Sequence, residues 1–177
     1  MKTIIAGTII LACLLLMIAG CRDDYSDISF SKVESERTKL IGGIESYQRI
    51  DEFENLLGNK SSWEVSKESP PSPKGRPPFN MTTIVTKQYT HLGYTGSLEV
   101  SFFNNRLIST TFYPSDADKY VEALVKVEGL RFNDSHEASL PPYTRVKFET
   151  DYKGRKYVDW ADVRLDTEVG VWIKRYS

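Results

Sequence analysis

SLEVSFFNNRLISTTFYP, from Ser97 to Pro114, is the stretch that decides the fold. Its first part, 97–103, alternates polar with apolar side chains, and 106–114 repeats a strand-like pattern. Asn104 and Asn105 lie between them, and asparagine tolerates the positive φ angles that a tight hairpin turn needs. The stretch therefore predicts a β-hairpin with one apolar and one polar face, so that the sheet has a core side and a wet side.

Strand-like segments lie on both sides of this hairpin. They are rich in β-branched residues or alternate apolar with charged side chains, and short turns separate them. One of these turns is expected at 94–96, a second at Gly154 and a third at 166–167. The expected strands outside the hairpin cover 61–68, 81–93, 143–151, 156–165 and 168–176.

Two segments have helical spacing instead. In the first, apolar residues recur from Ile50 to Leu57 with acidic residues between them, and Gly58 follows as a stop. In the second, Ser115 and Asp118 have the spacing of a capping box and Gly129 ends the helix. Its apolar stripe is expected to pack on the apolar side of the hairpin and comprises Tyr120, Val121, Leu124 and Val127.

These blocks of strands and helices predict an α+β fold. We expect an antiparallel β-sheet of about five to six strands with two amphipathic helices packed on one face. The segment 69–79 contains five prolines and predicts a stiff loop that Phe79 pins to the domain, and a second irregular loop is expected at 130–142. A single domain is expected over 40–177, with 40–44 as a short extended entry.

The N-terminus shows where the protein is expected to act. After Lys2 the chain is almost wholly apolar, and it ends in Ile-Ala-Gly-Cys at 18–21 before turning charged. This pattern predicts an export signal over 1–20 that is cleaved between Gly20 and Cys21. The motif resembles the bacterial lipobox, which implies a diacylglyceryl group on the Cys21 thiol and a further acyl chain on the new amino terminus.

Several consequences follow from a lipidated Cys21. Two or three acyl chains hold a protein stably on a membrane. The alternative, an uncleaved membrane-spanning segment, is short for the roughly 20 apolar residues a span needs. By resemblance to lipoproteins of enteric bacteria, Arg22 in place of an aspartate favours the outer membrane, facing the periplasm, over the inner membrane. Residues 21–39 are expected to form a flexible tether, or alternatively a docking segment for a partner.

Composition excludes several classes of function. Loss of Lys2 with the signal would leave 22 basic residues against 24 acidic ones, a net charge of about −2. Nucleic-acid binding needs a dense excess of Lys and Arg, so no nucleic-acid partner is expected. The two cysteines are Cys13, lost with the signal, and Cys21, so the domain has no disulfide, no cysteine nucleophile and no thiolate metal ligand.

No motif predicts catalysis, a metal or a cofactor. His91 and His136 have no metal-ligand partners at short spacing, and His91 is expected to be an isolated surface residue. The run at 134–137 places triad residue types side by side, but a triad is assembled in space and not along a loop. The pair Asp116 and Asp118 is better explained by helix capping. A sequence does not reveal whether two carboxylates converge, so a small cell-wall hydrolase stays open as a minor hypothesis.

Aromatic and basic residues supply the candidate binding surface. In the expected strand 168–176, Trp172, Lys174 and Tyr176 point to one side, and Trp160 lies on the neighbouring strand. Such residues are enriched in binding patches but are also common in cores, and both interpretations stay open. Lys74 and Arg76 give the proline-rich loop a small basic patch as a second possibility.

A helix ending at Leu57-Gly58, then Trp63, then the Leu98 to Phe112 hairpin, all behind a lipobox, is similar to the small accessory lipoprotein of the outer-membrane β-barrel assembly machinery. The similarity covers less than half of the mature chain, and the proline-rich loop and the C-terminal strands depart from it. It implies that such a fold serves as a docking module and assigns a role to no residue.

The sequence thus predicts a membrane-anchored envelope lipoprotein whose domain binds another envelope protein without catalysis. The alternative is a periplasmic inhibitor or immunity protein that blocks a secreted hydrolase or toxin by presenting an acidic or aromatic plug on a loop.

Overall fold

A computed structural model describes residues 29–177 apart from 31, 33, 35, 58–62 and 70–74. The expected signal peptide, its cleavage site after Gly20 and the lipidated Cys21 lie outside the described residues. So do Gly58, the expected stop of the first helix, and Lys74. These features stay predictions.

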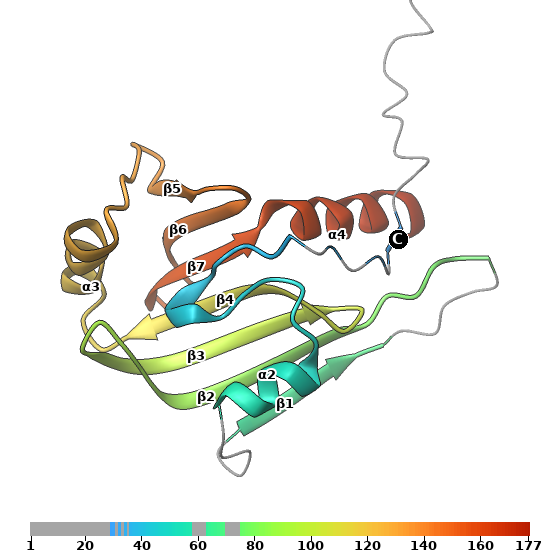
Figure 1. Ribbon diagram of the computed structural model, residues 1–177, viewed down its shortest axis with the longest axis horizontal. Helices are drawn as coiled ribbons and strands as arrows, with labels where there is room; N and C mark the ends of the chain where they lie inside the picture. The colour runs from blue at the N-terminus through green and yellow to red at the C-terminus, as the bar shows by residue number, and fades with distance from the viewer. Residues whose placement is uncertain (1–28, 31, 33, 35, 58–62, 70–74) are drawn as a thin grey trace, which may run out of the picture.

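The core of the fold is one antiparallel sheet of seven strands, more than the five to six expected (Figure 1). The strand order is β1-β2-β3-β4-β7-β6-β5, and every neighbouring pair is antiparallel. Neighbours in sequence are neighbours in space except where β4 pairs with β7. The strands are β1 (Trp63–Glu68), β2 (Met81–His91), β3 (Tyr94–Phe103), β4 (Arg106–Pro114), β5 (Glu137–Leu140), β6 (Thr144–Thr150) and β7 (Lys156–Asp162).

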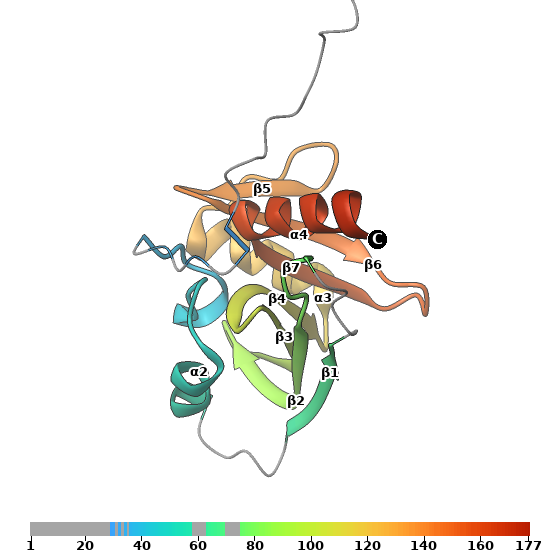
Figure 2. The same ribbon diagram turned by 90° about the vertical axis from the view of Figure 1, so that its right-hand side faces the viewer.

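Helices lie at several positions around the sheet (Figure 2). The first predicted helix is confirmed, and the second is confirmed with different limits and continues as one π-helical turn up to Gly129, whose φ is 69°. The elements are the 3-10 turn η1 (Ile41–Gly43), α2 (Ile50–Leu57), α3 (Ala117–Ala123), η3 (Leu124–Glu128) and α4 (Val163–Tyr176).

The β3–β4 hairpin has the expected asparagine turn. Asn104 and Asn105 have φ angles of 48° and 63°. Both side chains also hold other segments, because Asn105 Oδ1 accepts a hydrogen bond from the N–H of Ile50 at the start of α2. Asn104 Nδ2 donates to the carbonyl oxygens of Phe30 and Pro78. The turn that closes the hairpin therefore also fixes the helix and two loops beside it.

Two hydrophobic clusters pack on opposite faces of the sheet. Phe102 belongs to one cluster and its neighbour Phe103 to the other, as expected when successive strand residues point to opposite sides. The larger cluster includes Phe53 of α2 and Tyr120 of α3, and the smaller one includes Trp172 of α4. Both helices that the sequence predicted therefore contribute to the larger cluster, and α4, which it did not predict, contributes to the cluster on the other face.

The expected turn at 166–167 and the expected terminal strand at 168–176 are wrong, because these residues belong to α4. The helix begins at Val163, so the expected strand 156–165 ends at Asp162. The apolar helix residues Leu165, Val169, Trp172 and Tyr176 recur at helical spacing and join the smaller cluster. Asp162 caps the helix, since its side chain accepts from the N–H of Arg164. The strand-like alternation of Val169 with the residues after it hid this longer period.

Four smaller expectations are also corrected. The turn before β3 lies at Leu92 and Gly93, and not at 94–96, which are in the strand. The side chain that caps α3 is Asp116, which accepts from the N–H of Lys119, rather than Ser115. The expected loop 130–142 contains the edge strand β5, and Val127 of the expected apolar stripe is 65% exposed.

The described residues of the expected tether contact the domain. Phe30 is buried in the smaller cluster, and its carbonyl accepts from Nη2 of Arg106 at 2.8 Å. Thr38 is buried, and its hydroxyl lies 2.6 Å from that of Thr144 on β6. The folded domain therefore begins before residue 40, and the expected entry 40–44 is a 3-10 turn flanked by a single bridge between Lys39 and Glu45.

Candidate functional site

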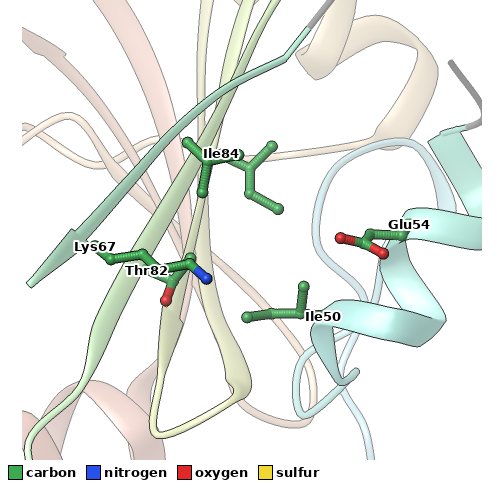
Figure 3. Close-up of a pocket in the computed structure, with 6 residues that line it drawn as sticks. Ile50, Glu54, Lys67, Thr82 and Ile84 are labelled. Carbon is green, nitrogen blue, oxygen red and sulfur yellow. The ribbon is translucent and has the colours of Figure 1, made fainter. Parts of the chain in front are cut away.

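A groove of about 490 Å³ opens between α2 and the β1 end of the sheet (Figure 3). Ile50 and Glu54 reach into it from α2, and the facing residues come from β1 and β2. The groove therefore has an apolar floor with one carboxylate and one ammonium group at its rim. The lining residues are Ile50, Glu54, Val65, Lys67, Thr82 and Ile84.

The strand register explains which side chains face the groove. Val65 lies opposite Ile84 on β2, and Lys67 lies opposite Thr82. Residues directly opposite one another in an antiparallel pair share a face of the sheet. Ile84 is 2% exposed whereas Val65 is 54% exposed, so the apolar surface passes from the core outward to the edge strand.

Helix α2 is fixed firmly enough to form the other wall. Phe53 is fully buried, and its ring lies 6.0 Å from that of Trp63 on β1 and 5.5 Å from that of Phe102 on β3. Glu52 forms a 2.7 Å ion pair with Arg37. Phe53 therefore holds α2 against the sheet beside the groove.

Strand β1 is also one edge of the sheet. All six of its residues pair with β2 in one unbroken register, and no other described strand pairs with its outer side. Every second residue of an edge strand directs its N–H and C=O away from the sheet. The groove therefore lies beside a row of backbone groups that are able to pair with another chain.

This arrangement is suited to binding. An apolar side chain would bury surface against Ile50, Val65 and Ile84, while the strand edge would satisfy backbone donors and acceptors. Sequence reasoning missed this site. The sequence offered one signal for it. In the strand WEVSKE, Val65 is the single apolar residue after Trp63, which is typical of a strand that is exposed to solvent.

The structure brings three of the predicted binding residues together, because Arg76 contacts Tyr176 and the ring of Tyr176 packs on that of Trp172, and it places Trp160 elsewhere. Trp160 is on β7 and has no exposed area, and its ring lies 6.3 Å from that of Tyr120 in the larger cluster. It is therefore core and is not accessible to a partner. Lys174 is exposed on α4, and Arg76 is exposed on the loop before β2, where its Nη1 donates to the backbone carbonyl of Tyr176.

Trp172 and Tyr176 are part of the smaller cluster. Trp172 is 8% exposed, and its Nε1 donates to the carbonyl of Pro77 at 3.1 Å. Its ring lies 4.5 Å from that of Phe79 and 5.5 Å from that of Tyr176. Phe79 therefore pins the proline-rich loop as predicted, and of the two interpretations left open for Trp172 the core one holds.

The face of the sheet opposite the larger cluster carries two carboxyl groups with raised pKa values. Burial raises the pKa of Asp159 to about 6, although the Thr111 hydroxyl, 2.8 Å away, favours the charged form. Burial also raises the pKa of Glu99. In register, Thr111 stands between these two residues, which places them two strands, about 10 Å, apart.

His91 is not the isolated surface residue that was expected. Its Nδ1 lies 2.7 Å from the Tyr120 hydroxyl and its Nε2 lies 3.3 Å from a Glu128 carboxylate oxygen. Burial of the ring holds the pKa of Tyr120 well above its usual range. The chain of three groups ties β2 to α3 and η3, which is a structural role. His136 is exposed in a turn with a φ of 58°.

No protein-family model matches the chain, and a comparison with curated proteins found no relative. Within the part of the chain that the structure describes, no group of three or more His, Cys, Asp or Glu side chains is placed to hold a metal ion. None of the helices formed by these residues has the length and apolar character needed to cross a bilayer.

Proposed function

We propose that this protein is a lipid-anchored envelope lipoprotein whose domain binds another envelope protein without catalysing a reaction. The observation that carries the proposal is the groove between α2 and β1, where the half-exposed Val65 adjoins a strand edge with which no described strand pairs. The lipobox at 18–21 supports the membrane anchor, and Arg22 supports the outer membrane.

The chemistry of the groove favours a protein over a small polar ligand. Its floor is apolar, and the rim offers one ammonium group and one carboxylate, Lys67 and Glu54. A small ligand would leave the adjoining backbone edge unused, whereas a polypeptide would engage the groove and the edge together. An anchored module with such a surface would hold its partner at the membrane.

A second candidate is the inhibitor or immunity protein, and one observation favours it. Tyr152 is 90% exposed at the tip of the β6–β7 turn. Asp151 stiffens that turn by accepting from the backbone N–H groups of Lys153 and Arg155 and from the Arg155 guanidinium, all within 2.9 Å. A rigid aromatic residue on a loop would suit insertion into the active site of an enzyme.

Photo-crosslinking from defined positions distinguishes the docking function from the inhibitor function. A photoreactive residue is placed at Val65, at Tyr152 or, as a control, at Ile173, which is exposed on α4. Each version is made with native Cys21 and with Cys21→Ala. We expect one envelope protein to crosslink from position 65 only. The yield of this product should be lower in the Cys21→Ala version, which lacks the anchor. The crosslinked protein is then purified and its binding is measured directly.

Two other outcomes would contradict the docking proposal. A single secreted enzyme crosslinked from position 152, equally with and without Cys21, would favour the inhibitor. The same products from positions 65 and 173 would show that the groove is not a specific site.

A further inference from the structure

The edge of β1 has the features of a strand that accepts another strand. It contains six residues, has no proline, glycine or bulge, and pairs with β2 at every position. Natural sheets commonly protect an exposed edge strand with a proline or a bulge, or cover it with another segment. The opposite edge of the sheet, β5, has only four residues. Of the two edges, β1 is therefore the better acceptor.

The two faces of β1 carry different charges. Val65 and Lys67 point to the groove, whereas Glu64 and Glu68 alternate with them and point to the other face. Glu64 pairs with Lys87 of β2 at 2.5 Å, and Lys67 forms no ion pair with any residue the structure describes. A strand added beside β1 would meet one positive charge on the groove face and two negative charges on the opposite face.

We propose that the partner supplies an extended segment that adds to the sheet antiparallel to β1 as an eighth strand. Its residue opposite Val65 is apolar and enters the groove, its residue opposite Lys67 is acidic, and its residues opposite Glu64 and Glu68 are basic. The antiparallel direction continues the pattern of the whole sheet. This inference rests on the proposed function and names the kind of segment the groove takes.

Opposite charges directly across neighbouring strands stabilise the pair, and like charges destabilise it. Backbone hydrogen bonds would supply affinity, while the alternating side chains would supply specificity. The acidic residue beside Lys67 is the most selective position, because Lys67 is the one ammonium group among the described residues that line the groove.

A designed hexapeptide tests the inference with the full folded chain. The sequence Lys-Glu-Thr-Ile-Lys-Val, blocked at both ends, places these residues in order opposite Glu68, Lys67, Ser66, Val65, Glu64 and Trp63. The control Glu-Lys-Thr-Ile-Glu-Val reverses the three charges. We expect the first peptide to bind at least tenfold more tightly than the control. We also expect Lys67→Glu to weaken it about tenfold, and a peptide with lysine at its second position to restore binding to that variant.

N-methylation of single peptide amides identifies the binding mode. In an antiparallel strand pair, every second residue directs its N–H to the neighbouring strand. Methylation at these alternate positions should therefore reduce affinity at least tenfold, while methylation at the positions between them should change it less than threefold. Binding of a side chain to the groove alone would not produce this alternation.

Three results would overturn the inference. The first is no binding of either peptide at millimolar concentration, and the second is equal loss at all methylated positions. The third is self-association of the chain that Lys67→Glu abolishes, because the occupant of the edge would then be a second copy. If an envelope protein still crosslinks from position 65 in such a case, the docking function stands and only the strand addition fails.

Discussion

The groove beside β1 and the smaller hydrophobic cluster, to which α4 contributes, are two apolar regions that differ in their exposure to solvent. At the cluster, Trp172 keeps only 8% of its surface exposed; at the groove, Val65 keeps 54%. The cluster is closed from two sides, since Phe79 packs against Trp172 and Phe30 packs against Tyr176. The groove is bounded by α2 and by β1 and β2, and no strand among the described residues pairs with the outer edge of β1.

The comparison shows that composition does not decide which apolar region is free. The aromatic residues that most resembled a binding patch are sealed by segments far away in the sequence. A single valine on a charged strand stays open because no described segment covers that edge. Substitutions in the closed region should therefore change stability, and substitutions in the open region should change binding.

The largest effect is expected for Arg106→Met. Arg106 is 1% exposed, and its guanidinium lies 2.9 Å from Glu168 and donates to the carbonyl groups of Phe30 and Lys32. Removing one partner of a buried ion pair costs about 3–5 kcal/mol, because the other charge is left uncompensated. The free energy of unfolding in urea measures this loss.

Adding Glu168→Gln to Arg106→Met is the control for this explanation. The glutamine carries no charge, so the double variant should recover part of the lost stability. If the double variant is no more stable than Arg106→Met, the loss reflects packing and backbone contacts rather than the unpaired carboxylate.

A loss of about 3 kcal/mol is expected for Trp172→Ala, because truncation of a buried tryptophan leaves a large cavity. The hydrogen bond from the indole to Pro77 is lost as well. Ile173→Ala is the matched control on the same helix, since Ile173 is 48% exposed and should cost less than about 0.5 kcal/mol. Similar losses for both variants would mean that the cluster is not closed.

The next effect depends on pH and concerns Asp159→Asn. Burial raises the pKa of Asp159 from 3.8 to about 6, so the folded state holds the proton more tightly than the unfolded state. The stability from the protonated group is complete below pH 3.8 and is lost as the pH rises through about 6. Relative to the wild type, Asp159→Asn should gain about 2 kcal/mol between pH 4 and pH 7.

Urea unfolding of both proteins at several pH values measures this difference. Asparagine keeps an oxygen that accepts from the Thr111 hydroxyl, so the local hydrogen bond is preserved in the variant. Curves that stay parallel between pH 4 and pH 7 would show that Asp159 has an ordinary pKa.

Much of the sheet was predictable because its turn residues and its polar–apolar alternation match the positions that these residues take in the structure. Asn104 and Asn105 suit a tight turn, and the residues on either side alternate as their two faces require. The end of the chain was not predictable in the same way. Val169 and the residues after it satisfy both a strand period and a helix period, and only the cap at Asp162 and the packing of Leu165 decide for the helix.

The site was less predictable than the fold, for a physical reason. Exposure of Val65 depends on which segments lie over β1, and the sequence of β1 does not contain that information. Trp160 shows the converse, since the sequence left both a binding patch and the core open for it, and it lies in the larger cluster with its ring 6.3 Å from that of Tyr120. Burial of a single residue is set by long-range packing, whereas strand alternation is set locally.

The smallest effect on stability is expected where the groove is open, at Val65→Ala. Half of the Val65 side chain is in water already, so the truncation should lower the free energy of unfolding by less than about 0.5 kcal/mol. The same change removes apolar contact for a bound segment and should weaken binding of the designed hexapeptide about fivefold, which corresponds to about 1 kcal/mol. Trp172→Ala measured at a temperature where it stays folded should show the reverse pattern, with unchanged peptide affinity. If instead Val65→Ala destabilises the domain as Trp172→Ala does, β1 is covered in solution and the contrast between the two regions does not hold.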